Sequence, residues 1–345
     1  MMTTLILWGT LAFVLSFFLT LFVRRVAIHF GIIDQPGSWR KIHSRPVAML
    51  GGIAIFVSIT AATIGILISS DWLTSGEIAT RQYVGVLLGG LILMVGGIID
   101  DRFTLPPRLA IIAPILAVLT AIWFGIEVEK LSNPLGGQIF LAGWQSDLLV
   151  FVWLLVVMYT TKFLDGLDGL ATSVTSVGAL MVMLLSLTVA YFQPDVALLS
   201  AVALGAFVGF LFWNIHPASI FLGEGGSTFV GYMLGILAVI SGGKLATALL
   251  VLGIPLLDVV WVVSRRWREG GFSRIFQGDK KHLHHRLLKL GWGQTHIVLL
   301  YIVIASAFGV SALFLQSREK LVALLILGII MVLGALLLVQ KDRHA

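Results

Sequence analysis

Runs of apolar residues recur along the whole chain and are separated by short polar segments. A helix that crosses a bilayer needs about 20 mostly apolar residues, and windows of that kind predict about eleven membrane-spanning helices. The expected spans are residues 5–23, 50–69, 84–99, 108–125, 146–161, 170–191, 196–213, 228–241, 244–263, 297–316 and 321–340. No polar segment is long enough to form a separate soluble domain, so we expect a single all-α polytopic membrane domain over residues 1–345.

Residues 126–145, between two of these spans, have the composition of a turn. Asn133-Pro134 and Gly136-Gly137 lie between short apolar stretches, which predicts a small hairpin. We find no residues suited to catalysis in it.

The composition agrees with a membrane protein and excludes a soluble fold. Hydrophobic residues make up 58% of the chain and charged residues 12%, whereas about 25% of an ordinary soluble domain is charged. The chain has no cysteine, which excludes disulfides and thiolate metal ligands.

The formal net charge of +6 reflects how Lys and Arg are distributed between the loops. An outside N-terminus places the loops 24–49, 100–108, 162–169, 214–227 and 264–296, with the tail 341–345, in the cytoplasm. The only Lys and Arg residues then left outside are Arg81, Lys130, Lys244, Arg318 and Lys320. Because Lys and Arg concentrate in cytoplasmic loops, we expect the N-terminus outside and the C-terminus in the cytoplasm. Topology then explains the charge, and we expect no nucleic-acid partner.

The same orientation brings the unusual polar residues to the cytoplasmic ends of the helices. They are Asp100, Asp101, Asp165, Asp168, Glu224, His282, His284 and His285. Ionisable residues are costly in a membrane and usually mark a functional site, so we expect these residues to form one active site. Asp258, inside the span 244–263, fits either this site or a pairing with a neighbouring helix.

Each acidic motif has a functional and a structural interpretation. The adjacent carboxylates of Asp100 and Asp101 repel one another, which favours a cation such as Mg²⁺ or Mn²⁺, but Arg102 would also neutralise an ordinary helix end. Asp165 and Asp168 precede an expected helix, where capping explains one carboxylate and the second favours a ligand site.

Two further motifs suit phosphate groups. Glu224 lies among glycines in the stretch 221–227, a composition suited to a loop around phosphate and metal. His282-Leu283-His284-His285 lies among the cations Lys280, Lys281, Arg286 and Lys289. Imidazoles with cations suit a diphosphate, and a basic segment that rests on anionic lipid headgroups is compatible with the same pattern.

Together these motifs resemble those of the polyprenyl-phosphate N-acetylhexosamine-1-phosphate transferases, from Asp34 to about Gly291. The matching stretches are Arg40-Lys41-Ile42-His43, Asp100-Asp101, Asp165-Gly166-Leu167-Asp168-Gly169, Asn214 with Phe221 to Ser227, and His282 to His285. The histidine motif and the last expected span are most similar to the branch that uses UDP-GlcNAc and undecaprenyl phosphate. The branch that uses UDP-MurNAc-pentapeptide is the alternative within the family.

The resemblance implies transfer of a sugar-1-phosphate, most simply GlcNAc-1-phosphate, from a UDP-sugar to undecaprenyl phosphate, with release of UMP. It implies a Mg²⁺ cofactor, with Mn²⁺ as a substitute, and a place in the bacterial inner membrane with the site facing the cytoplasm. Expected partners are the two substrates and membrane lipid, and a homodimer is compatible with the family.

The resemblance and the charge chemistry together assign roles to residues of this chain. The expected catalytic residues are Asp100, Asp101 and Asp168, with Glu224, Asp100 and Asp101 as metal ligands. The expected substrate-binding residues are Lys41, His43, Lys162, Asp165, Asn214, Phe221, His282, His284, His285 and Arg286.

Two positions depart from the family's pattern. Glu224 stands where an Asp is usual, and Lys162 stands where an Asn is usual. Glu is still a hard oxygen ligand, so metal binding is retained in principle. The resemblance implies that Lys162 replaces a residue that usually lies beside the nucleotide.

Two other protein classes fit the sequence less well. CDP-alcohol phosphotransferases need an Ala-Arg pair where this chain has Thr172-Ser173, and no acid occurs between Asp168 and Asp195. A cation-coupled transporter would place carboxylates near the bilayer midplane, whereas these acids, Asp258 apart, lie at helix ends.

Overall fold

The computed structural model describes the chain except for residues 38–44, 134–135, 243–244, 271–281, 316–317 and 330–345. The described residues are mostly helical. In chain order the elements are α1 (Met2–His29), β1 (Ile33–Asp34), β2 (Val47–Ala48), α2 (Gly51–Ser69), α3 (Thr80–Phe103), α4 (Pro107–Ala110), α5 (Ile112–Trp123), β3 (Lys130–Ser132), β4 (Gln138–Phe140), α6 (Gly143–Leu164), α7 (Leu170–Ser186), η1 (Val189–Tyr191), α8 (Pro194–Asn214), α9 (Gly223–Ile240), α10 (Leu245–Val251), α11 (Gly253–Gly270), α13 (Leu283–Lys289) and α14 (Gln294–Phe314).

The helices confirm a polytopic membrane protein. Within the described residues, seven helices are long and apolar enough to cross a membrane, namely α1, α2, α3, α6, α8, α9 and α14. Two other expected spans, 108–125 and 170–191, coincide with the shorter apolar helices Pro107–Trp123 and Leu170–Ser186. The last expected span, 321–340, lies partly outside the described residues. The chain is therefore a multi-pass, all-α membrane protein.

The expected span 244–263 is not one straight helix. It forms α10 and the first part of α11, which meet at an angle of 79°. Pro255 explains the break, because it has no N–H to donate to the carbonyl of Val251 and its ring crowds that carbonyl. Counted as one broken span, this pair raises the number of candidate spans in the described chain to eight.

Two short antiparallel pairs of strands lie in the loops between helices. β3 pairs with β4, with Lys130 opposite Phe140, which confirms the hairpin expected within residues 126–145. β1 pairs with β2, with Ile33 opposite Ala48, in the loop between α1 and α2.

Helix α9 lies at the centre of the bundle. Of its membrane-spanning window 89% is buried, compared with 22% for α1, and it packs against α2, α3, α6 and α7. Glycine permits the closest contacts: a Cβ on Gly52 of α2 would collide with Gly226, and one on Gly97 of α3 with Gly225. These glycine pairs fix the start of α9 against α2 and α3.

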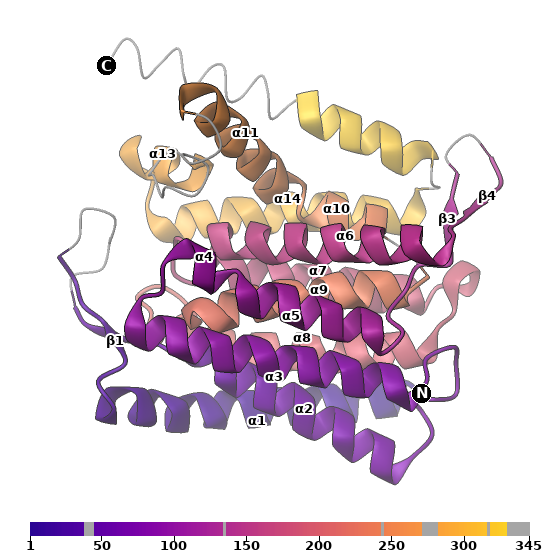
Figure 1. Ribbon diagram of the computed structural model, residues 1–345, viewed down its shortest axis with the longest axis horizontal. Helices are drawn as coiled ribbons and strands as arrows, with labels where there is room; N and C mark the ends of the chain where they lie inside the picture. The colour runs from indigo at the N-terminus through magenta and orange to yellow at the C-terminus, as the bar shows by residue number, and fades with distance from the viewer. Residues whose placement is uncertain (38–44, 134–135, 243–244, 271–281, 316–317, 330–345) are drawn as a thin grey trace.

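The loops expected in the cytoplasm gather at one end of the bundle (Figure 1). β1, α4 and α13 lie at that end, whereas the N-terminus and the β3–β4 hairpin lie at the other. The acidic and histidine motifs therefore share one end of the molecule.

Candidate active site

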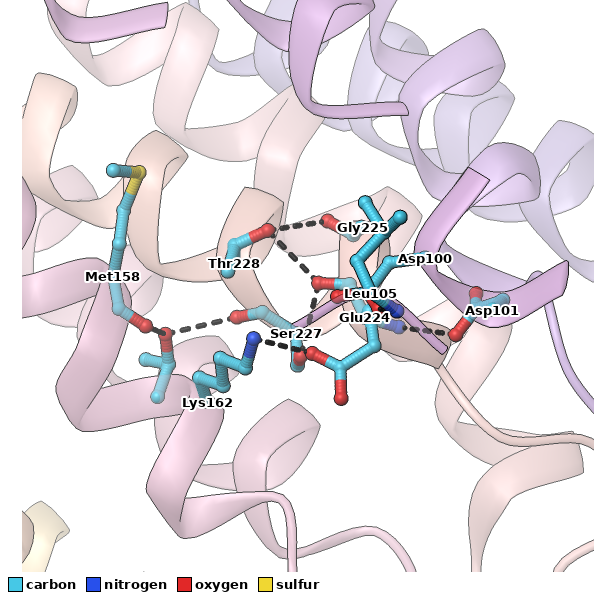
Figure 2. Close-up of polar contacts among 10 residues, drawn as sticks. Asp100, Asp101, Leu105, Met158, Lys162, Glu224, Gly225, Ser227 and Thr228 are labelled. Atoms are coloured by element: carbon cyan, nitrogen blue, oxygen red, sulfur yellow. Dashed lines mark hydrogen bonds and ion pairs between the residues drawn. The ribbon is translucent and has the colours of Figure 1, made fainter. Parts of the chain in front are cut away.

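The first turn of α9 places Glu224, and Asp101 of α3 caps this turn. The backbone N–H of Glu224 donates to Asp101 Oδ1 at 3.0 Å (Figure 2). A carboxylate in this position satisfies a free N–H group and interacts favourably with the helix dipole. A side chain on Gly223 would collide with the Asp101 carboxylate. Asp101, expected as a catalytic or metal-binding residue, thus supports the helix that carries Glu224.

Glu224 also forms an ion pair with Lys162 in the last turn of α6. Lys162 Nζ lies 2.5 Å from Glu224 Oε2, and Figure 2 shows the two side chains pointing toward one another. The Thr161 hydroxyl, next to Lys162, donates to the carbonyl of Ser227 at 2.9 Å and ties α6 to α9. The two positions that depart from the family's pattern therefore contact one another.

Asp100 turns to the loop that follows α3. Its Oδ1 accepts a hydrogen bond from the backbone N–H of Leu105 at 2.8 Å. It lines a small hollow of about 20 Å³ that Lys162 and Glu224 also border. Asp100 is therefore a neighbour of the ion pair.

Asp168 is fixed by the segment between α8 and α9. Its Oδ2 accepts the backbone N–H of Ala218 at 3.1 Å and lies 2.6 Å from Nδ1 of His216. His216 was not among the predicted site residues. It lies in an expected cytoplasmic loop, between the motif residues Asn214 and Phe221, and this position is the feature of the sequence that could have identified it.

Asp165 follows the last residue of α6 and faces the same cavity as Glu224. Burial raises the pKa of the Asp165 carboxyl to about 8. The negative charges of Glu224, Asp101 and Asp168 act on this pKa in the same direction. Asp165 is therefore mostly protonated at neutral pH, and a bound cation would favour its ionised form.

These side chains surround a cavity of about 290 Å³ at the loop end of the bundle. Its expected members are Lys162, Asp165, Asp168, Asn214, Phe221, Glu224 and His285. The cavity is also lined by Asp34, Met49, Ser227 and Gln294, for which the sequence predicts no role. The volume lies at the lower end of the range typical of small-molecule sites.

Asn214 and Phe221 hold the segment that forms one wall of the cavity. The Asn214 side chain accepts from the Thr172 hydroxyl at 3.1 Å and donates to the carbonyl of Ile220 at 3.0 Å. The backbone of Phe221 bonds to Ala48 of β2 at 2.8 Å. Lys41 and His43 lie outside the described residues.

The histidine motif reaches the cavity through His285. His282 Nδ1 lies 2.7 Å from Asp258 Oδ2, and Asp258 Oδ1 accepts the backbone N–H of Leu283 at 2.9 Å. Asp258 therefore holds the start of α13 and does not line the cavity. Arg286 lies on α13, also outside the cavity lining.

His284 is buried between the other rings and the turn that carries the aspartates. Its ring stacks on that of His282, with centroids 5.8 Å apart, and a Cβ on Gly166 would meet its Nε2 at 2.5 Å. Burial lowers the pKa of His284 well below its usual range, and the charges of His285 and His282 lower it further. His284 is thus a neutral contact between α13 and the Asp165–Asp168 turn.

Comparison with known proteins identifies the family. Residues 83–242, from α3 to α9, match glycosyl transferase family 4. A protein of Bacillus subtilis (strain 168) named "Probable undecaprenyl-phosphate N-acetylglucosaminyl 1-phosphate transferase" is 30% identical over 91% of this chain and 86% of its own length. The chain belongs to glycosyl transferase family 4.

Other relatives of this glycosyl transferase family 4 member show the breadth of the similarity. "Decaprenyl-phosphate N-acetylglucosaminephosphotransferase" of Mycobacterium tuberculosis (strain CDC 1551 / Oshkosh) is 32% identical over 99% of this chain and 90% of its own length. "Phospho-N-acetylmuramoyl-pentapeptide-transferase" of Moorella thermoacetica (strain ATCC 39073 / JCM 9320) is 27% identical over 78% of this chain and 84% of its own length.

The donor set of the family 4 cavity suits a hard divalent cation. In the part of the chain that the structure describes, no three acidic or histidine side chains converge as a ready-made cage. Mg²⁺ is usually held by one or two carboxylates together with substrate phosphates and water. The carboxylates of Asp34, Asp165, Asp168 and Glu224 all line the cavity and so provide at least that number, whereas Asp100 and Asp101 are not among its lining residues. The residues therefore fit Mg²⁺ that arrives with a diphosphate.

Proposed function

We propose that this member of glycosyl transferase family 4 transfers GlcNAc-1-phosphate from UDP-GlcNAc to undecaprenyl phosphate. The products are UMP and a lipid-linked diphosphate sugar that starts a cell-wall or surface polysaccharide. One observation carries the proposal: Lys162, Asp165, Asp168, Glu224 and His285 line a single cavity at the ends of membrane-spanning helices. The printed names of the relatives from Bacillus subtilis and Mycobacterium tuberculosis support GlcNAc-1-phosphate as the transferred group.

The reaction exchanges one phosphoanhydride bond for another. An oxygen of the acceptor phosphate forms a bond to the sugar-bearing phosphorus, and the bond from that phosphorus to UMP breaks. The acceptor phosphate is already largely ionised near pH 7, because its second pKa is about 6. Deprotonation of the acceptor by a protein base therefore contributes little, and positioning of the substrates and stabilisation of their negative charge provide most of the catalysis.

The residues of the cavity divide these tasks. Glu224 and Asp165 would hold Mg²⁺, and when bound this ion stabilises negative charge on the diphosphate. Lys162 and His285 face the same space and would contact phosphate oxygens. Asp100 or Asp101 would orient the acceptor phosphate or accept its last proton.

The membrane arrangement follows from the loops and their charge. We infer eleven spans, an outside N-terminus and a site that opens to the cytoplasm of a bacterial inner membrane. The gathering of the motif loops at one end (Figure 1) and the Lys and Arg bias support this arrangement.

The test uses the purified chain in detergent with undecaprenyl phosphate, Mg²⁺ and sugar-labelled UDP-GlcNAc or UDP-MurNAc-pentapeptide. We expect labelled lipid from UDP-GlcNAc, and no product when the metal is chelated. Labelled lipid only from UDP-MurNAc-pentapeptide would assign the chain to the other branch of the family. Uptake of label into proteoliposomes that contain the purified chain, without formation of labelled lipid, would indicate a transporter.

A further inference from the structure

The Lys162–Glu224 ion pair lies where the proposed metal would bind. Lys162 is the only Lys or Arg among the described residues that line the main cavity, and it borders the small hollow beside Asp100 as well. The Glu224 side chain is 40% exposed and that of Lys162 is 24% exposed, although Glu224 Oε2, the atom that Lys162 contacts, is buried. Both side chains border the cavity, so a ligand in the cavity can reach them.

The contacts around Lys162 define its resting position. Besides the 2.5 Å contact with Glu224 Oε2, Nζ lies 5.9 Å from the centroid of the Tyr159 ring, one turn earlier on α6. A cation over an aromatic face is weakly attracted to it. Glu224 and Tyr159 together keep the ammonium at the boundary between the cavity and the hollow.

A divalent cation and an ammonium compete for the same carboxylate. An opposite charge within about 4–6 Å lowers the pKa of a carboxylate by about one to three units, because it stabilises the ionised form. A paired ammonium lowers the affinity of the carboxylate for a metal cation in the same way. The two cations also repel one another at this separation. A metal bound at Glu224 must therefore displace Lys162, unless a diphosphate supplies the negative charge that accommodates both.

The geometry points to Lys162 as a built-in counter-cation that keeps metal affinity at Glu224 low until the nucleotide diphosphate arrives, when its ammonium moves to a phosphate oxygen. This inference rests on the proposed role of Glu224 as a metal ligand. It makes metal and nucleotide binding mutually dependent, and it gives a physical reason for Lys and Glu to occur together at these positions.

The test measures binding of Mn²⁺ to the purified full-length protein in detergent by electron paramagnetic resonance, with and without UDP. We expect Lys162→Met to bind Mn²⁺ without nucleotide on the order of ten-fold more tightly than wild type. The matched control Lys162→Arg keeps the charge and should bind Mn²⁺ as wild type does. UDP should strengthen Mn²⁺ binding strongly in wild type and much less in Lys162→Met.

Several results would overturn the inference. The inference would be wrong if Lys162→Met bound Mn²⁺ no more tightly than wild type, or if Lys162→Arg bound it as tightly as Lys162→Met. It would also be wrong if UDP strengthened Mn²⁺ binding equally in wild type and in Lys162→Met. If Lys162→Met does not fold, Lys162→Gln removes the charge, keeps a polar side chain and provides the same comparison. Glu224→Gln tests the role of Glu224 as a metal ligand separately from the role of Lys162. Wild-type Mn²⁺ affinity in this variant would show that Glu224 does not bind the metal, whatever the Lys162 variants show.

Discussion

Asp258 and His282 form a buried contact between α11 and the start of α13, with Oδ2 and Nδ1 2.7 Å apart. The second oxygen of Asp258 accepts the N–H of Leu283, so one carboxylate fixes both the ring and the backbone of the motif. His282 in turn stacks on Phe163, whose ring centroid is 5.6 Å away. The histidine motif is thereby attached to α6 and α11.

Asp258→Asn should weaken this attachment. An amide keeps the shape but loses the charge, and a hydrogen bond to a charged group contributes about 1.5–3 kcal/mol. We expect KM for UDP-GlcNAc to rise about ten-fold or more, with a smaller change in kcat. Steady-state kinetics measure this, with the exposed acid of the opposite end, Asp147→Asn, as control. A wild-type KM in a folded Asp258→Asn protein would show that the contact does not position the motif.

Asp168 and His216 should act as a coupled pair. Asp168→Asn should lower turnover by about 10², the scale of a lost catalytic charge contact. His216→Gln should lower it less, because Asp168 keeps its bond from the Ala218 N–H. The double variant should lose less than the sum of the single losses. Strictly additive losses would mean that the 2.6 Å contact has no role in turnover.

Asp100→Asn and Asp101→Asn should each lower turnover by about 10² or more. Asp101→Ala should also lose about 0.5–2 kcal/mol of stability, because Asp101 caps α9 and Ala removes the acceptor that Asn retains. Thermal unfolding alongside activity separates the loss of the cap from the loss of the charge. If both variants are near-normal in turnover, these residues are an ordinary solvated helix end.

Asp165 should make the metal-free protein less stable as pH rises. Its pKa is about 8 in the fold, above its usual value of 3.8, so the folded state retains a proton that the unfolded chain has lost. The stabilisation is therefore full below about pH 4 and is lost as pH rises through 8. The difference in unfolding temperature between wild type and Asp165→Asn, measured from pH 5 to 9, should follow this course. Saturating Mg²⁺ should make this temperature difference nearly independent of pH. A difference that does not change with pH in the metal-free protein would contradict the raised pKa of Asp165.

Much of the fold could be predicted because a lipid environment imposes simple rules on sequence. Apolar runs located α2, α6, α8 and α14 to within a few residues, whereas α1 extends to His29, beyond the expected end at residue 23. The bend between α10 and α11 was missed because the run is mostly apolar and hydropathy ignores the backbone effect of Pro255.

The candidate site could be predicted as a group of residues but not as a set of contacts. The Lys and Arg bias placed Asp165, Asp168, Glu224 and His285 on one side, and these residues line one cavity. The pairs Asp168–His216 and Asp258–His282 join residues on different elements, and no local pattern encodes such contacts. The same holds for Lys162 and Glu224, which the sequence showed only as separate departures from a family pattern.

The most direct test of the central claim follows the β-phosphate of the donor. Purified protein would be incubated with undecaprenyl phosphate, Mg²⁺ and UDP-GlcNAc that carries a radiolabel in its β-phosphate. Transfer of a sugar-1-phosphate predicts that the label enters the lipid fraction and that unlabelled UMP accumulates in equal amount. Label retained in released UDP, with unlabelled sugar on the lipid, would mean transfer of the sugar alone and would contradict the account.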